Sequence, residues 1–173
     1  YEEIMGMCVM LFMGGLDTVT SSLGFIFRYL AEHPEQQAWL RADPSAIPTA
    51  VEELLRLYPI ITTGRLASRD VEIAGALIKA GENVACPLVC ASRDPEEFEN
   101  PDVDDLTRNP NRHGAFGFGP HRCIGSHLAR RELNIAVEQW LALLPPFRVK
   151  PGVELRAQGA GVVALTQLPL VFD

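Results

Sequence analysis

FGFGPHRCIG, residues 116–125, is a glycine-rich loop that carries one cysteine close to its end. Glycine adopts backbone angles that other residues avoid, so such a loop can pass close beneath a flat ligand. After it, apolar residues recur at helical spacing over 129–144 until Pro145. Cys123 is therefore expected at the start of a helix, where the dipole and exposed amide protons favour a thiolate, and Arg122 adds a nearby positive charge.

Three roles fit a cysteine in this setting. A thiolate at a helix start is the ligand that a haem iron needs when the sulfur must push electron density toward bound oxygen. A buried structural cysteine is the ordinary alternative. A zinc site is the third, although His121 and Cys123 are closer in sequence than structural zinc ligands usually are. The candidate zinc ligands are His113, His121, Cys123 and His127. The dinucleotide-binding fingerprint fails, because its third glycine would come too late.

The composition is typical of one soluble domain. Of 173 residues, 47% are hydrophobic, which is enough for a sizeable core without disulfides. The net charge of -7 argues against a nucleic-acid surface, which would need a basic stripe. Cys8, Cys86 and Cys90 lie in apolar runs, so we expect them in the core of a reduced, cytoplasmic protein. The apolar stretch 4–16 is shorter than the roughly 20 residues of a membrane span. We expect a buried helix there, and no membrane.

Periodicity predicts a mainly α-helical fold with a minor β part, as a single domain over residues 1–173. Helices are expected at 4–32, 34–42, 48–58 and 123–144. Short β-prone runs lie at 71–73, 77–78, 84–88 and within 147–173. Residues 93–122 form an unusually long loop, which indicates a functional segment. The chain has no initial Met and enters an apolar helix almost at once, so we interpret it as the C-terminal portion of a larger domain.

Polar residues interrupt the first helix where packing alone would not select them. Asp17 and Thr18 directly follow the segment Gly14-Gly15-Leu16. A helical threonine can donate a hydrogen bond to the carbonyl one turn earlier, and the two glycines leave space there for dioxygen. An ordinary polar notch in a core helix is the alternative.

Glu53 and Arg56 share one face of the third predicted helix, because residues at i and i+3 are neighbours on a helix. If this pair is buried, the loss of one partner costs about 3 to 5 kcal/mol. If it is exposed, the pair contributes under about 1 kcal/mol. The spacing does not distinguish the two cases.

Taken in chain order, these motifs resemble the cytochrome P450 family. Residues 116–125 match its signature F-x-x-G-x-R/H-x-C-x-G, residues 14–18 its A/G-G-x-D/E-T motif, and residues 53–56 its E-x-x-R motif. Arg108-Asn109-Pro110 falls where the family has its meander loop, although Leu106 stands where an aromatic residue is usual. The likeness is strongest to bacterial camphor hydroxylases. It covers only the C-terminal portion of the family fold, so the N-terminal part would be absent.

The resemblance implies a haem b cofactor and assigns its contacts. Cys123 would be the iron ligand, Phe116 would shield the sulfur, and Gly117 would belong to the same haem-binding loop. Arg65 and His121 would pair with the haem propionates, because a guanidinium fork fits a carboxylate.

The resemblance also assigns the oxygen side of the haem. Thr18 would steady activated oxygen, and Asp17 would relay protons from solvent. Glu53 and Arg56 would be a buried structural pair. Thr63 replaces an aspartate that camphor hydroxylases have near a propionate, which would change that network but not the ligation. The substrate pocket would be lined by Met10, Met13, Gly14, Ile61 and Val162.

The implied activity is a monooxygenase reaction that inserts one atom of O2 into a small apolar substrate such as a terpenoid. Electrons would come from a [2Fe-2S] ferredoxin with an NAD(P)H-dependent reductase, and would enter on the Cys123 side. Two alternatives stay open. One is a truncated, non-catalytic remnant that cannot close a haem pocket, and the other is a zinc-binding structural module.

Overall fold

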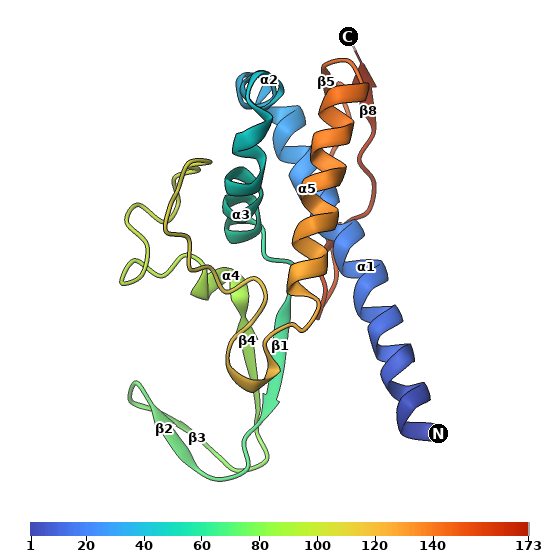
Figure 1. The fold of residues 1–173 in the computed structure, drawn as a ribbon. Coiled ribbons are helices and arrows are strands. Elements are labelled where there is room, and N and C mark those ends of the chain that lie inside the picture. The colour runs from blue at the N-terminus through green and yellow to red at the C-terminus, as the bar shows by residue number, and fades with distance from the viewer. Residues whose placement is uncertain (173) are drawn as a thin grey trace.

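Four helices form the body of the computed structural model, which describes residues 1–172 (Figure 1). They are α1 Glu2–Glu32, α2 Pro34–Ala42, α3 Ile47–Leu57 and α5 Ser126–Leu143. The C-terminal half of α1 packs against the other three, whereas its N-terminal half projects beyond them. Three short helical turns complete the helical part, namely η1 Pro44–Ala46, α4 Leu88–Ala91 and η2 Gly119–His121.

The strands form four separate two-stranded antiparallel sheets. The pairs are β1 Thr62–Leu66 with β4 Asn83–Pro87, β2 Val71–Ile73 with β3 Ala76–Ile78, β5 Phe147–Val149 with β8 Leu170–Phe172, and β6 Ala157–Gln158 with β7 Ala164–Leu165. The β2–β3 hairpin projects from the body, while β5 and β8 lie against α1 and α5. The prediction of a mainly helical fold with a minor β part is confirmed.

One hydrophobic core joins α1, α2, α3 and α5. Its buried side chains include Ile26, Leu30, Leu40, Val51, Leu54, Leu133, Val137 and Leu141. The buried side chain of Gln37 connects α1 and β5 within this core. Its amide nitrogen donates to the carbonyls of Leu30 and Phe147, and its amide oxygen accepts the Phe147 N–H. This buried side chain satisfies backbone groups at the end of α1 and on β5 that would otherwise lack partners. The sharp turn between α1 and α2 follows from Pro34, which occupies the first turn of α2.

Residues 4–16 form a helix as expected, but the expectation that this helix is buried is wrong. These residues are helical, but each of them is exposed, and Met10 has 76% of its surface accessible. The apolar pattern indicates a helix surface that is stable only when another segment or molecule packs over it. None of residues 1–172 packs over this part of α1. The buried half of α1 begins only near Ser21.

The expectation that the three other cysteines lie in the core is also wrong. Cys8 and Cys90 are exposed, and Cys86 is partly buried. Cys8 lies on the uncovered half of α1. The run 84–91 changes from strand to helix at Leu88, and this leucine takes the buried position while Cys90 turns outward.

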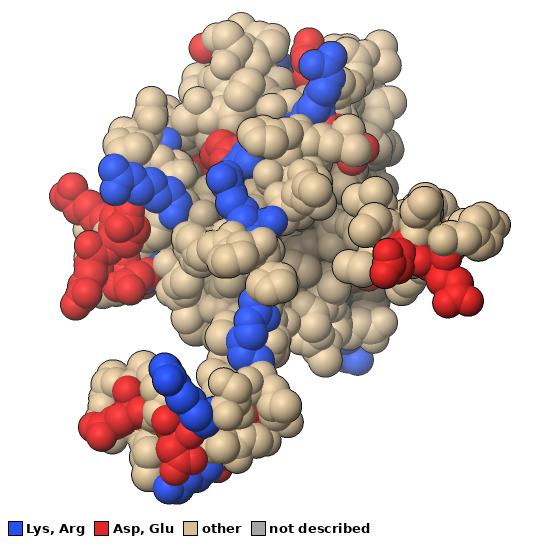
Figure 2. All heavy atoms as spheres, turned by 60° about the horizontal axis from the view of Figure 1, so that its bottom comes forward, with Lys and Arg blue, Asp and Glu red and all other residues tan. Residues whose placement is uncertain are grey.

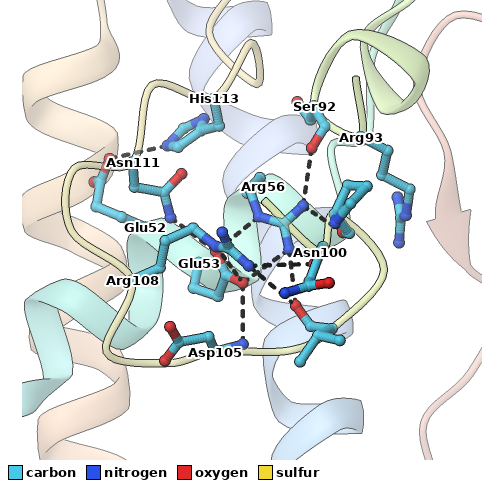
Figure 3. Close-up of polar contacts among 12 residues, drawn as sticks. Glu52, Glu53, Arg56, Ser92, Arg93, Asn100, Asp105, Arg108, Asn111 and His113 are labelled. Carbon is cyan, nitrogen blue, oxygen red and sulfur yellow. Dashed lines mark hydrogen bonds and ion pairs between the residues drawn. The ribbon is translucent and has the colours of Figure 1, made fainter. Parts of the chain in front are cut away.

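A buried ion pair on α3 anchors the long loop that follows α4 (Figure 3). Glu53 and Arg56 are both completely buried, and the guanidinium donates two hydrogen bonds of 2.8 Å to the carboxylate. The Arg56 Nη1 donates to the carbonyls of Ser92 and Pro101, and Nη2, which also bonds Glu53, donates to the carbonyl of Val103. Of the two cases that the sequence left open for this pair, the structure has the buried one.

The carboxylate of Glu53 receives three more hydrogen bonds from the same loop. The backbone N–H of Asp105 lies 3.1 Å away, the Arg108 Nε lies 3.2 Å away, and the Asn111 Nδ2 lies 2.8 Å away. Leu106, between two of these donors, is buried in the core. The loop is therefore ordered by the bonds that it must make to a buried charge pair.

We expect Glu53→Gln to lower the free energy of unfolding of the intact protein by about 3 to 5 kcal/mol, because it leaves the Arg56 guanidinium as a buried charge without its carboxylate. Urea unfolding measures this loss. Glu138→Gln, on the exposed face of α5, is the matched control and should change stability by less than about 0.5 kcal/mol. Equal losses in the two variants would contradict a dominant role of the pair.

Candidate functional site

The cysteine loop is closed on itself by backbone hydrogen bonds. The Cys123 N–H donates to the Phe116 carbonyl at 2.9 Å, and the Arg122 N–H donates to the Gly119 carbonyl at 3.0 Å. Gly117 and Gly119 have φ values of +70° and +68°. Only glycine adopts these angles without strain, so the two glycines are needed for the loop to double back and present the cysteine.

Helix α5 begins at Ser126, so the expectation that Cys123 itself starts the helix is wrong by three residues. The Ser126 N–H donates to the Cys123 carbonyl at 3.3 Å, and Gly125 is the N-cap. This tight turn holds the cysteine just ahead of the helix. The Cys123 thiol is exposed. It is free to bind a ligand that approaches from outside the loop.

Thr18 makes the hydrogen bond that its position in the helix suggested. Its Oγ1 donates to the Gly14 carbonyl one turn earlier, at 2.6 Å. Asp17, beside it, is exposed. A Cβ added at Gly14 or at Gly15 would meet nothing within 4 Å. This stretch of α1 therefore combines an open surface with a hydroxyl group of fixed direction.

Apolar side chains are exposed both around the cysteine loop and on the first half of α1. Phe118 and Ile124 of the loop and Leu128 at the start of α5 are between 62% and 87% exposed, and on α1 the exposed apolar residues run from Ile4 to Leu16. Figure 2 brings this end of the molecule forward and shows a mostly uncharged surface that is hollowed beside α1. Soluble proteins rarely expose apolar surface of this extent unless something covers it.

The residues present fit a haem. The exposed Cys123 sulfur is a suitable axial ligand, and the surrounding apolar surface suits a flat macrocycle. Arg65, on β1, and His121, on η2, are both exposed. Within residues 1–172 neither is paired with a carboxylate, and the one hydrogen bond of the Arg65 side chain goes to the Gly64 carbonyl. Two donors are thus available for acidic groups at the edge of a ligand.

The residues expected to line a substrate pocket fall into two groups. Ile61 and Val162 lie side by side, since they form an isolated antiparallel bridge. Met10, Met13 and Gly14 are exposed on α1. A separate open pocket of about 450 Å³ lies where α1, α4 and the end of α3 meet. Its lining includes Phe25, Leu57, Tyr58 and Val89, and none of the expected substrate-pocket residues.

A second carboxylate of α3, Glu52, joins α3 to α5 and to the segment just before the cysteine loop. Its oxygens accept hydrogen bonds from Arg130 Nε at 2.6 Å and Arg130 Nη2 at 3.0 Å, and from His113 Nε2 at 2.9 Å. The Ala115 N–H donates to the other ring nitrogen of His113, Nδ1, which leaves the proton on Nε2. The guanidinium of Arg130 lies over the Phe116 ring, 4.4 Å from its centroid.

No motif in the sequence indicated a role for Glu52 or Arg130, and His113 was expected only as a candidate zinc ligand. Helical spacing could not reveal the contact, because the three residues come from α3, α5 and the loop between α4 and η2. The zinc hypothesis gains no support, since no three His, Cys, Asp or Glu side chains among the described residues could hold a metal ion together.

Burial alone would raise the pKa of Glu52, but the hydrogen bonds and charges of His113 and Arg130 outweigh it and lower the pKa to about 2. Because this value lies below the ordinary 4.5, the ionised carboxylate stabilises the folded state above about pH 5. That stabilisation is lost as the pH falls toward 2.

We therefore expect the difference in unfolding free energy between the intact protein and its Glu52→Gln variant to shrink by on the order of 3 kcal/mol between about pH 5 and pH 2. Urea unfolding at a series of pH values measures it. The exposed Glu132 provides the control, since Glu132→Gln should give a difference that hardly depends on pH. A pH-independent difference for Glu52→Gln would show that its carboxylate is not held ionised.

Comparisons with known proteins agree on one family. A family model described as Cytochrome P450 matches residues 1–169. The probable cytochrome P450 127A1 of Sinorhizobium fredii is 43% identical over 171 residues, which cover 99% of this chain and 41% of that protein. The biotin biosynthesis cytochrome P450 of Bacillus subtilis is 41% identical over 173 residues, covering 99% and 44% respectively.

A solved structure gives the same result for the fold. The crystal structure of cytochrome P450 CYP101C1 matches with a TM-score of 0.91 at 40% identity, over 96% of this chain and 43% of that one. The chain thus spans less than half the length of the curated relatives that it matches. Members of the matched family bind haem b, and the cysteine loop, the α1 motif and the buried α3 pair are present together here. The chain belongs to the cytochrome P450 family.

Proposed function

We propose that the intact protein is a haem-thiolate monooxygenase, and that residues 1–173 form the C-terminal, haem-binding portion of its domain. The observation that carries this proposal is the exposed Cys123 thiol on a closed, glycine-dependent loop, in a chain whose α1 also exposes a long apolar surface. When bound, haem b supplies the iron chemistry that activates dioxygen. The residues of this chain bind it, orient it and manage protons.

On the sulfur side, Cys123 would provide the thiolate that binds the iron, and Phe116 and Gly117 shape the loop around it. The Cys123 N–H is already bonded to the Phe116 carbonyl, so the sulfur is presented from a backbone of fixed geometry. Arg65 and His121 hold the two propionates, for which their exposed and otherwise uncommitted donors are suited.

On the oxygen side, Thr18 and Asp17 manage protons. Because the Thr18 hydroxyl donates to the Gly14 carbonyl, its oxygen is left to accept a hydrogen bond from a water or a protonated group beside it. Asp17 is exposed and can exchange protons with solvent. The pair thus connects bulk water with the surface on which oxygen chemistry takes place.

The substrate is proposed to be a small apolar molecule, with a terpenoid as the favoured class. Met10, Met13, Ile61 and Val162 present only apolar side chains to it, and Gly14 leaves space. Electrons are proposed to come from a [2Fe-2S] ferredoxin and its NAD(P)H-dependent reductase, on the Cys123 side. The protein is proposed to be cytoplasmic. By length and composition α1 could cross a membrane, but core helices of soluble proteins meet the same criteria.

Cys123→His should abolish the thiolate-type Soret band of the reduced, carbon monoxide-bound protein even if haem is retained, because imidazole does not donate charge as a thiolate does. The absorption difference spectrum of the intact protein measures this. Cys90→Ala, which changes another exposed cysteine, should leave the band unchanged. Persistence of the thiolate-type band in Cys123→His would refute the ligand assignment.

Thr18→Ala should keep oxygen and NAD(P)H consumption but divert most turnover to hydrogen peroxide, since protons would no longer be delivered in an ordered way. Asp17→Asn keeps the shape of the side chain and removes the titrating carboxylate, so it should slow turnover instead. Oxygen uptake, peroxide and hydroxylated product are measured together in the intact protein. Undiminished coupling in Thr18→Ala would mean that the polar notch in α1 is only structural.

A further inference from the structure

Two neighbouring glutamates on α3 contact different parts of the molecule. Glu53 binds Arg56 and the loop after α4, and Glu52 binds His113 (Figure 3). Glu52 also binds Arg130, on α5. We propose that Glu52 is a positioning residue for the Cys123 thiolate, acting through Arg130 and the Phe116 ring. This inference rests on the proposed function, because it concerns the ligand that the haem would use.

The first of the contacts that connect Glu52 with Cys123 is the ion pair between Glu52 and Arg130. Both side chains have about a quarter of their surface exposed, with 26% each. The guanidinium donates two hydrogen bonds to the carboxylate, at 2.6 and 3.0 Å. A two-bond contact fixes the plane of the guanidinium as well as its position, which a single bond would not do.

The second contact is between Arg130 and Phe116. The guanidinium carbon lies 4.4 Å from the centroid of the phenyl ring, within the range of a cation–π contact. The His113 ring lies 6.0 Å from the same ring. Because Arg130 and His113 both bind Glu52, one carboxylate fixes two of the groups that surround the Phe116 side chain.

The third contact joins Phe116 to Cys123 through the backbone. The Phe116 carbonyl accepts the Cys123 N–H at 2.9 Å, and this bond closes the loop. Gly117, next in sequence, has a φ of +70° and offers no side chain to hold the loop from within. The Phe116 ring is therefore one anchor of this segment, and a shift of that ring is expected to move the carbonyl to which the cysteine amide is bonded.

Charge gives Glu52 a second effect on the same ligand. In the folded protein its carboxylate neutralises Arg130, which lies against the loop that carries the sulfur. Without the carboxylate, an unpaired positive charge would remain on this side of the loop. Positive charge near a thiolate withdraws electron density from it and favours the reduced state of a bound metal.

The test compares Glu52→Gln, Arg130→Met and the exposed control Glu132→Gln in the intact haem-loaded protein. Two quantities are measured, namely the rate at which the thiolate-type carbon monoxide band converts to a form without it, and the midpoint reduction potential. Glu52→Gln and Arg130→Met should both convert several-fold faster than the parent protein, because each releases the Phe116 ring. The potential should rise in Glu52→Gln, which leaves Arg130 unpaired, and should not rise in Arg130→Met.

A purely structural role would give a different result. If Glu52→Gln lowers the unfolding free energy but converts at the rate of Glu132→Gln, with an unchanged potential, the positioning role is overturned and the proposed function stands. If the parent protein itself shows no thiolate-type band, the proposed function fails and this inference fails with it. Arg130→Lys, which keeps the charge but not the planar fork, covers the case in which Arg130→Met does not fold. It should also convert faster.

Discussion

The buried ion pair between Glu53 and Arg56 is the constraint on which the arrangement of the rest depends. Moving two charges out of water is unfavourable, and their attraction offsets this only when the remaining hydrogen-bonding groups are also satisfied. Here the satisfying groups come from a loop far along the chain, through the carbonyls of Ser92 and Val103 and the side chain of Asn111. The pair therefore requires this loop to be ordered, and the loop leads directly into the cysteine segment.

The helix that carries this pair connects the hydrophobic core with the site. One face of α3 contributes Val51 and Leu54 to the core. Glu53 bonds to the loop after α4, and Glu52 bonds to Arg130 of α5, which in turn contacts Phe116 of the cysteine loop. Because α3 is packed on the core and bonded through adjacent carboxylates, the cysteine loop is connected to the buried core of the molecule. This explains how a loop with two left-handed glycines can present one thiol in a defined direction.

The N-terminal half of α1, unlike α3, is exposed and is not packed on the core. It has apolar side chains on its surface and no described residue packed over them, yet it carries the Thr18 hydroxyl in a fixed direction through its bond to Gly14. The chain spans less than half the length of its curated relatives. The proposed haem would cover part of this surface, and its apolar extent is what makes a flat, largely apolar cofactor the fitting occupant.

Local signals in the sequence determined the helices, most strands and the family. The apolar spacing and proline stops predicted both ends of α2 and placed each end of α3 one residue too late, and the cysteine signature identified the cytochrome P450 family, which the comparisons confirm. These features depend on residues close together in the chain, where spacing is equivalent to geometry. The start of α5 at Ser126 was not predicted. The apolar spacing marks the helix, but it does not show that Gly125 is the N-cap.

Only the tertiary structure decided which polar groups meet and which apolar groups are covered. It placed Glu53 and Arg56 in the interior, brought Glu52 to Arg130, and left Cys90 and the first half of α1 exposed. A periodic pattern states that a helix face is apolar or charged, but it contains no information on which distant segment packs against that face. Burial and partner choice come from contacts between segments far apart in sequence, so they exist only once the chain has folded.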